Sequence, residues 1–133
     1  MGASEEAEVL RLMEGWVASS TADRRVDDAA IRALVTPDFV FRLHTGGGDR
    51  TIDGFIAMVR EQAGRGTEVV ISNARSRVFD GGGLLQDTVT VTPSPGAEPV
   101  RIERCFVFTV ADGRLALVEE YLDPTPMRAP RQP

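Results

Sequence analysis

The chain has 133 residues, a net charge of −5 and 42% hydrophobic residues, which fits one globular domain with a core of its own. The sequence has no basic block, which argues against nucleic acid as a partner, and no apolar run near the ~18 residues of a membrane span. All 15 Lys and Arg residues are arginine, so Schiff-base chemistry on a lysine is excluded. One histidine and one cysteine make an ordinary zinc site unexpected. We therefore expect no metal and no cofactor and, because the acidic N-terminus does not read as a signal peptide, a cytoplasmic location.

The first half of the sequence predicts three helices around one strand. Ser4 is a candidate N-cap for a helix that runs to about residue 20, with Trp16 on its apolar stripe. A short second helix is expected over 28–35, a strand over 37–45 and a third helix over 53–63. Trp16 is expected to pack in the core, with a place in a cavity wall as the alternative.

From residue 67 onward the pattern is almost entirely that of strands. Alternating apolar residues predict a meander of four strands, over 67–79, 84–92, 100–110 and 114–122. Helices gathered on one side of an antiparallel sheet define an α+β fold. A strongly curved sheet under three N-terminal helices encloses a conical cavity, which commonly holds a small ligand. We expect residues 1–125 to form this single domain and the Pro-rich segment 126–133 to be a mobile tail.

The last two strands place two charged residues on an apolar face. The segment 111–113 between them reads as a three-residue hairpin loop, with its glycine in the left-handed conformation. If the residues that flank this loop pair, Arg104 lies directly opposite Glu120. Burial of a charged pair is costly and needs a reason. The apolar residues of the same face are Ile102, Phe106, Phe108, Val118 and Leu122.

The preceding strand adds a second carboxylate. Asp87 is the exception on a face that is otherwise apolar. The connection to the next strand leaves several registers open, and one of them pairs Val91 with Val100 and Asp87 with Arg104. Asp87, Arg104 and Glu120 then form a row across three neighbouring strands.

The order of the elements resembles the nuclear transport factor 2-like superfamily. The closing segment DGRLALVEEYLDP looks like the terminal strand of SnoaL-like polyketide cyclases, and LVTPDFVFRLHTGG looks like their first strand. The resemblance covers almost the whole chain and implies a cystatin-like α+β barrel. The superfamily includes ketosteroid isomerase, limonene-epoxide hydrolase and many non-catalytic binders, so the resemblance implies the fold more firmly than the activity.

Residues carried over from ketosteroid isomerase argue against its chemistry here. That enzyme uses an aspartate base near the end of its first strand, where residues 42–45 of this chain include no carboxylate. Its second aspartate, an oxyanion-hole donor, would fall near Arg104.

Residues carried over from limonene-epoxide hydrolase match in part. That enzyme uses two carboxylates bridged by an arginine; its final-strand aspartate matches Glu120, and its earlier aspartate falls near Asp87. Its arginine would be Leu85 here, a departure that Arg104 could restore from the adjacent strand. Its first-strand tyrosine is unmatched at Phe41, and its asparagine two residues on is unmatched too.

Two carboxylates around an arginine can divide the roles of acid and base, because one stays ionised and the other, less solvated, has a raised pKa. We expect Glu120, Asp87 and Arg104 to be catalytic, with help from His44, the only imidazole, on the strand that lines the cavity in this fold. The alternative is a structural salt-bridge network, with a structural histidine beside it.

The function expected on this basis is cofactor-independent acid–base catalysis by an enzyme of the SnoaL-like group. The reaction is cyclisation, isomerisation or epoxide opening on a polyketide- or terpenoid-like lipophilic substrate. The alternative is a non-catalytic small-ligand-binding or dimerisation module of the same fold. We also expect a homodimer, through the outer face of the sheet. The residues expected to bind the substrate are Trp16, Phe41, Phe106, Phe108, Val118 and Leu122.

Overall fold

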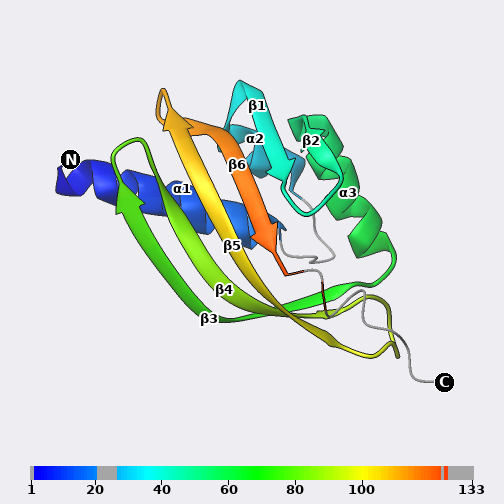
Figure 1. Cartoon of the computed structure of the whole chain (residues 1–133). Helices are drawn as coiled ribbons and strands as arrows, with labels where there is room; N and C mark the ends of the chain where they lie inside the picture. Colours follow the sequence, from blue (N-terminus) through cyan, green and yellow to red (C-terminus); the bar gives the residue numbers. More distant parts are fainter. Residues whose placement is uncertain (1, 21–26, 124, 126–133) are drawn as a thin grey trace.

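Helices and strands account for most of the chain in a computed structural model that describes residues 2–20, 27–123 and 125 (Figure 1). The helices are α1 (Ala3–Ser20), α2 (Asp28–Ala33) and α3 (Ile52–Gly64). The strands are β1 (Val35–Leu43), β2 (Gly48–Arg50), β3 (Glu68–Phe79), β4 (Gly82–Thr92), β5 (Val100–Ala111) and β6 (Arg114–Leu122). The segment predicted as a tail, 126–133, lies outside the described residues. None of the helices in the described part is long and apolar enough to cross a membrane.

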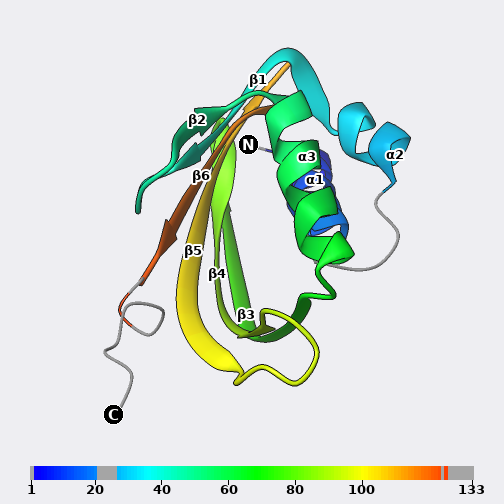
Figure 2. The same ribbon diagram turned by 90° about the vertical axis from the view of Figure 1, so that its right-hand side faces the viewer.

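The six strands form one sheet in the order β2-β1-β6-β5-β4-β3. Strands β3 to β6 are the predicted antiparallel meander, and β1 runs parallel to β6. Figure 2 shows that the sheet is strongly curved and that α1 and α3 lie on its concave side. The α+β fold is thus confirmed, with the sheet curved but not closed into a barrel.

The N-terminal half differs from the prediction at its boundaries. Asp27 caps α2 by accepting a hydrogen bond from the backbone of Ala30, and α2 ends two residues before its predicted end because Val35 already belongs to β1. Pro37 lies inside this strand, at the point where its register with β6 shifts, and there the missing N–H does not break the ladder. The short strand β2 was not predicted.

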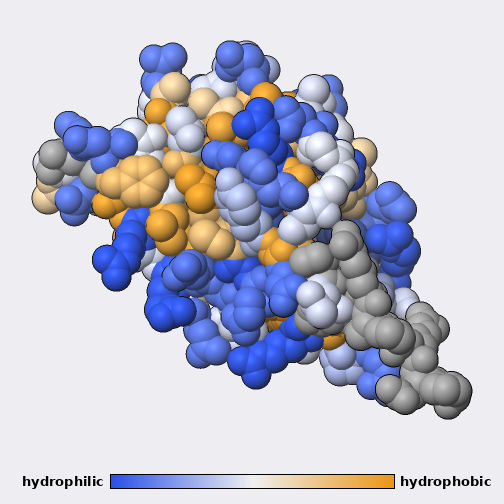
Figure 3. All heavy atoms as spheres, viewed as in Figure 1, coloured by the Kyte–Doolittle hydropathy of each residue, from blue (hydrophilic) through white to orange (hydrophobic). Residues whose placement is uncertain are grey.

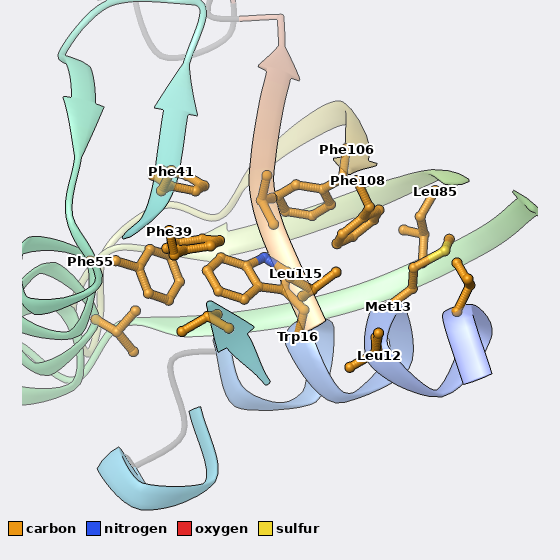
Figure 4. Close-up of a cluster of buried hydrophobic side chains, with 14 residues drawn as sticks. Leu12, Met13, Trp16, Phe39, Phe41, Phe55, Leu85, Phe106, Phe108 and Leu115 are labelled. Carbon is orange, nitrogen blue, oxygen red and sulfur yellow. The ribbon is translucent and has the colours of Figure 1, made fainter. Parts of the chain in front are cut away.

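The core lies between α1 and the sheet. The indole of Trp16 is fully buried and stacks on Phe55 of α3, with 4.3 Å between ring centroids. Figure 4 shows it amid the rings of Phe39, Phe41 and Phe55. The core-packing expectation for Trp16 is therefore confirmed, and the alternative also holds, as described below.

The hairpin between β5 and β6 turns more tightly than predicted. Asp112 and Gly113 both have positive φ angles, 53° and 73°, and Ala111 pairs with Arg114. This is a two-residue loop of the type that favours Asp-Gly, in place of the predicted three-residue loop. Beyond it the register shifts at Ala116, which has no partner on β5 and forms a bulge.

The tight turn and the bulge displace the pairing of the last strands by two residues. Arg104 pairs with Leu122, and Glu120 pairs with Phe106, so the predicted direct pairing of Arg104 with Glu120 is wrong. A displacement of two keeps every side chain on its predicted face, and Arg104 and Glu120 remain diagonal neighbours. The other register is confirmed, because Asp87 pairs with Arg104.

Candidate functional site

A cavity of about 240 Å³ opens between α3 and the concave face of the sheet. The helical wall consists of one residue of α1 and one stripe of α3 at spacings of three and four residues. These residues are Trp16, Phe55, Met58, Val59 and Gln62. The cavity differs from a larger hollow of about 410 Å³ on the outer face, which is open to solvent and has polar residues such as Gln86, Glu103 and Asp123 around it. A largely apolar cavity with few polar groups is the usual form of a small-molecule site.

The opposite wall of the cavity is the sheet. Its apolar side chains come from five strands and include Phe41, Leu43, Val89, Ile102, Phe106 and Leu122. The polar side chains in this wall are Arg104 and Glu120, and Thr67 lies at the end of α3. Since side chains alternate along a strand, these two charged residues reach the cavity from the same face as the apolar ones.

Arg104 is held in a fixed position by Asp87. Its Nε and Nη2 atoms donate hydrogen bonds of 2.9 and 2.8 Å to the two carboxylate oxygens of Asp87, a bidentate pair. The Asp87 side chain has no exposed surface, and that of Arg104 is 12% exposed. The guanidinium also lies 4.5 Å from the centroid of the Phe106 ring, within the range of a cation–π contact. These contacts leave Nη1 of Arg104 free of Asp87.

Glu120 is buried, and its carboxyl has no hydrogen-bond partner among the described residues. Its Oε2 atom lies 3.8 Å from Nη1 of Arg104, beyond hydrogen-bond distance, and the side chain is 15% exposed. Burial raises the pKa of Glu120 to about 7, although the charge of Arg104 lowers it; the charge of Asp87 adds to the rise. Near neutral pH this carboxyl is therefore present in both its protonated and its ionised form, so it can accept or donate a proton.

The two carboxyl groups stand in different relations to the cavity. Glu120 lines it, whereas Asp87 does not and is engaged by Arg104 on both oxygens. A substrate in the cavity would meet one carboxyl and one edge of a guanidinium. Chemically, that arrangement offers one group that can accept or donate a proton and one fixed cation that can stabilise an oxyanion.

His44 lies apart from these residues, on the outer face. Its Nε2 atom is 2.8 Å from a carboxylate oxygen of Glu119, and its ring stacks on Tyr121 with 4.2 Å between centroids. The expectation that His44 lies at the cavity is wrong, because β1 turns Phe41 and Leu43 inward and the alternating residues outward.

Four of the six residues predicted to bind the substrate line the cavity. These are Trp16, Phe41, Phe106 and Leu122. The other two, Phe108 and Val118, pair with each other on the sheet, are fully buried and belong to the core cluster with α1. The structure therefore does not place them at the cavity, because side chains of the core fill the space above them.

The sequence prediction did not identify the residues of α3 that line the cavity. Phe55 and Gln62 line the cavity but were not singled out, although Phe55, Met58, Val59 and Gln62 follow the spacing of one helix face. That spacing is the signal that could have identified them. Among the described residues there is no group of three or more His, Cys, Asp or Glu side chains that could hold a metal ion.

Comparison with known proteins identifies the family. The family model described as SnoaL-like domain matches residues 9–118. The structure of an LEH-like epoxide hydrolase from M. tuberculosis is 26% identical, with a TM-score of 0.73 over 93% of this chain and 89% of that chain.

Two further solved structures agree in fold. A protein of Jannaschia sp. CCS1, described as a candidate SnoaL-like polyketide cyclase, is 22% identical, with a TM-score of 0.70 over 95% of both chains. An NTF2-like protein of Burkholderia xenovorans LB400 is 15% identical, with a TM-score of 0.76 over 92% of this chain and 95% of that chain. A search of curated proteins finds no match. Because the family model covers most of the sequence, the chain belongs to the SnoaL-like domain family.

Proposed function

We propose that this protein is an enzyme that transfers protons on a lipophilic small molecule of polyketide or terpenoid type. The reaction is an isomerisation or an aldol-type cyclisation next to a carbonyl group, and it needs no cofactor. One observation carries the proposal: Glu120, with a pKa of about 7, lines an apolar cavity beside the free Nη1 of Arg104. A general base with a pKa near the working pH and a fixed cation beside it are the two parts that such chemistry needs.

The proposed reaction begins with the ionised form of Glu120. Its carboxylate takes a proton from the carbon next to the substrate carbonyl, and the electron pair of the broken C–H bond moves into the enolate. Nη1 of Arg104 donates a hydrogen bond to the enolate oxygen. In an isomerisation Glu120 returns the proton to another carbon. In a cyclisation the enolate carbon attacks a second carbonyl, and the new alkoxide receives the proton from Glu120.

Epoxide opening is the second candidate. It is favoured by the 26% identity with an LEH-like epoxide hydrolase and by the order of carboxylate, arginine and carboxylate across β4, β5 and β6. In this reaction Glu120 would activate a water molecule, while the opened epoxide oxygen would need a proton donor. Asp87, the other carboxylate of the row, is engaged by Arg104 on both oxygens, which favours the carbonyl chemistry.

A non-catalytic binding module is the rival from another class. For such a module we expect Arg104 and the two carboxylates to be fully paired and to leave no accessible cavity. The open cavity and the loosely held Glu120 support the enzyme instead.

The test is turnover of a panel of β-diketones, enones and epoxides by the wild type and by Glu120→Gln. We expect this variant to lose at least ~10²-fold in rate, the contribution typical of a general acid or base. Glu119→Gln is the matched control, because Glu119 is the neighbouring residue and its side chain contacts His44 and Tyr121 on the outer face. Equal rates in the wild type and Glu120→Gln would overturn the proposal.

We also propose that the protein forms a homodimer through the outer face of the sheet. Tyr121 on this face is 42% exposed, and Figure 3 shows apolar residues among the polar ones there. Light scattering coupled to size-exclusion chromatography should give twice the chain mass, and Tyr121→Glu should shift the protein toward a monomer. A wild-type monomer at high concentration would contradict this.

A further inference from the structure

We infer that the cavity takes a compact, uncharged molecule with a polar group at each end. One polar group lies at Glu120 and Arg104, and the second, a hydroxyl or a carbonyl, hydrogen-bonds to the side-chain amide of Gln62. The assignment of the first polar group to Glu120 and Arg104 rests on the proposed function, whereas recognition of the second group by Gln62 is independent of it.

The amide of Gln62 is the polar group that the helical wall offers to a ligand. Gln62 lines the cavity and is half-buried, and none of the hydrogen bonds among the described residues uses its side chain. The hydroxyl of Thr67, which also lines the cavity, donates a 2.8 Å hydrogen bond to the backbone oxygen of Pro93. A half-buried amide without a partner is a site for a hydrogen-bonding group, because leaving it unpaired under an apolar ligand has a free-energy cost.

Gln62 belongs to the helical wall of the cavity, and this wall faces the sheet wall that carries Arg104 and Glu120. Phe55 begins the cavity-facing stripe of α3 and packs on Phe41, with 4.9 Å between ring centroids. Gln62 follows seven residues later, about 10 Å further along the helix axis. There its backbone oxygen accepts a 3.1 Å hydrogen bond from Thr67, at the start of β3. Figure 2 shows α3 opposite the concave face of the sheet, of which β6 is one strand. A ligand that contacts both polar sites therefore bridges the helical wall and the sheet wall of the cavity.

The apolar walls, the volume and the charge balance of the cavity determine the remaining properties of the ligand. Val59, Val89 and Ile102 are among the apolar residues that line the cavity beside the two polar sites. The volume of about 240 Å³ lies below the ~300–1,000 Å³ typical of sites for drug-sized ligands, so the ligand is small. The ligand is uncharged in its ground state because Asp87 balances the charge of Arg104, so that Nη1 offers a ligand a hydrogen bond without a net positive charge.

The test uses octan-2-one and 8-hydroxyoctan-2-one as probes, which differ in one terminal hydroxyl. Binding is followed by the fluorescence of Trp16, the only tryptophan and part of the cavity wall. We expect the wild type to bind the hydroxy ketone about fivefold more tightly, the ratio that one net hydrogen bond supplies. Gln62→Leu should lose this preference, and the control Gln86→Leu, on the outer hollow, should keep it.

Three results would overturn the inference: no preference for the hydroxyl in the wild type, the same preference in Gln62→Leu, or no binding of either ketone. The variant Glu120→Gln separates this test from that of the proposed function. It should keep the preference for the hydroxyl, because the hydroxyl end does not contact Glu120. A Gln62-dependent preference without any turnover of the panel would remove the proposed function and leave the inference standing.

Discussion

The raised pKa of Glu120 predicts how the stability of the protein depends on pH. The pKa is about 7 in the folded protein and near its usual 4.5 in the unfolded chain, so the native state binds this proton more tightly. The difference, 7 − 4.5 = 2.5, corresponds to about 3 kcal/mol at 1.36 kcal/mol per pKa unit. This contribution to the free energy of unfolding is fully present below pH 4.5 and is lost as the pH rises through about 7.

The variant Glu120→Gln removes this titration while it keeps the shape of the side chain. Urea unfolding at pH 5, 6, 7 and 8, followed by tryptophan fluorescence, measures the free energy of unfolding of both proteins. Between pH 5 and pH 8 the wild type should lose about 2.5 kcal/mol relative to the variant, because part of the contribution is already lost at pH 5. Glu14→Gln, an exposed carboxyl on α1, should follow the wild type. If the gap between the wild type and Glu120→Gln is the same at every pH, the reasoning about its burial is refuted.

Three other substitutions test the packing around the site. Asp87→Asn removes the charge that balances Arg104 inside the sheet and should cost about 3 kcal/mol in urea unfolding; a cost below ~1 kcal/mol would show that the pair is not needed. Val59→Phe should fill the cavity and abolish the fluorescence response to octan-2-one with little change in melting temperature, whereas unchanged binding would move the site elsewhere. Gly82→Ala should cost at least ~2 kcal/mol, because a Cβ there would lie 1.8 Å from a carbonyl oxygen of β5, and Gly64→Ala, where nothing lies within 4 Å, should not; equal melting temperatures would contradict the close approach.

Alternation of apolar residues was sufficient to predict the sheet and half of the charged row. Strands β3 to β6 were found because their apolar residues recur every second position, and the pairing of Asp87 with Arg104 followed from one of the registers considered. The direct pairing of Arg104 with Glu120 was predicted wrongly, because the alternation of apolar residues in β6 does not reveal the bulge at Ala116. The shift it produces together with the turn is an even number of residues, so the prediction of a shared face survived.

The position of His44 could have been predicted from the sequence. Phe39, Phe41 and Leu43 form the apolar set of the first strand, and Arg42 and His44 fall on the other face. The resemblance to a family whose first strand lines a cavity outweighed that pattern. A cavity was expected from the curved sheet under the helices, but its size could not be predicted, because it depends on how far α3 stands from the sheet, which no local pattern encodes.

The central claim is that Glu120 is a titrating carboxyl in a cavity that holds an apolar molecule. Its most direct test is a carbon NMR titration of ¹³C-labelled glutamate carboxyls, assigned with Glu120→Gln, in the presence and absence of octan-2-one. We expect a midpoint near 7 for Glu120 in the free protein and a higher one when the ketone displaces water from the cavity. A midpoint near 4.5 that the ketone does not change would show that Glu120 does not titrate as a buried group in a ligand-binding cavity.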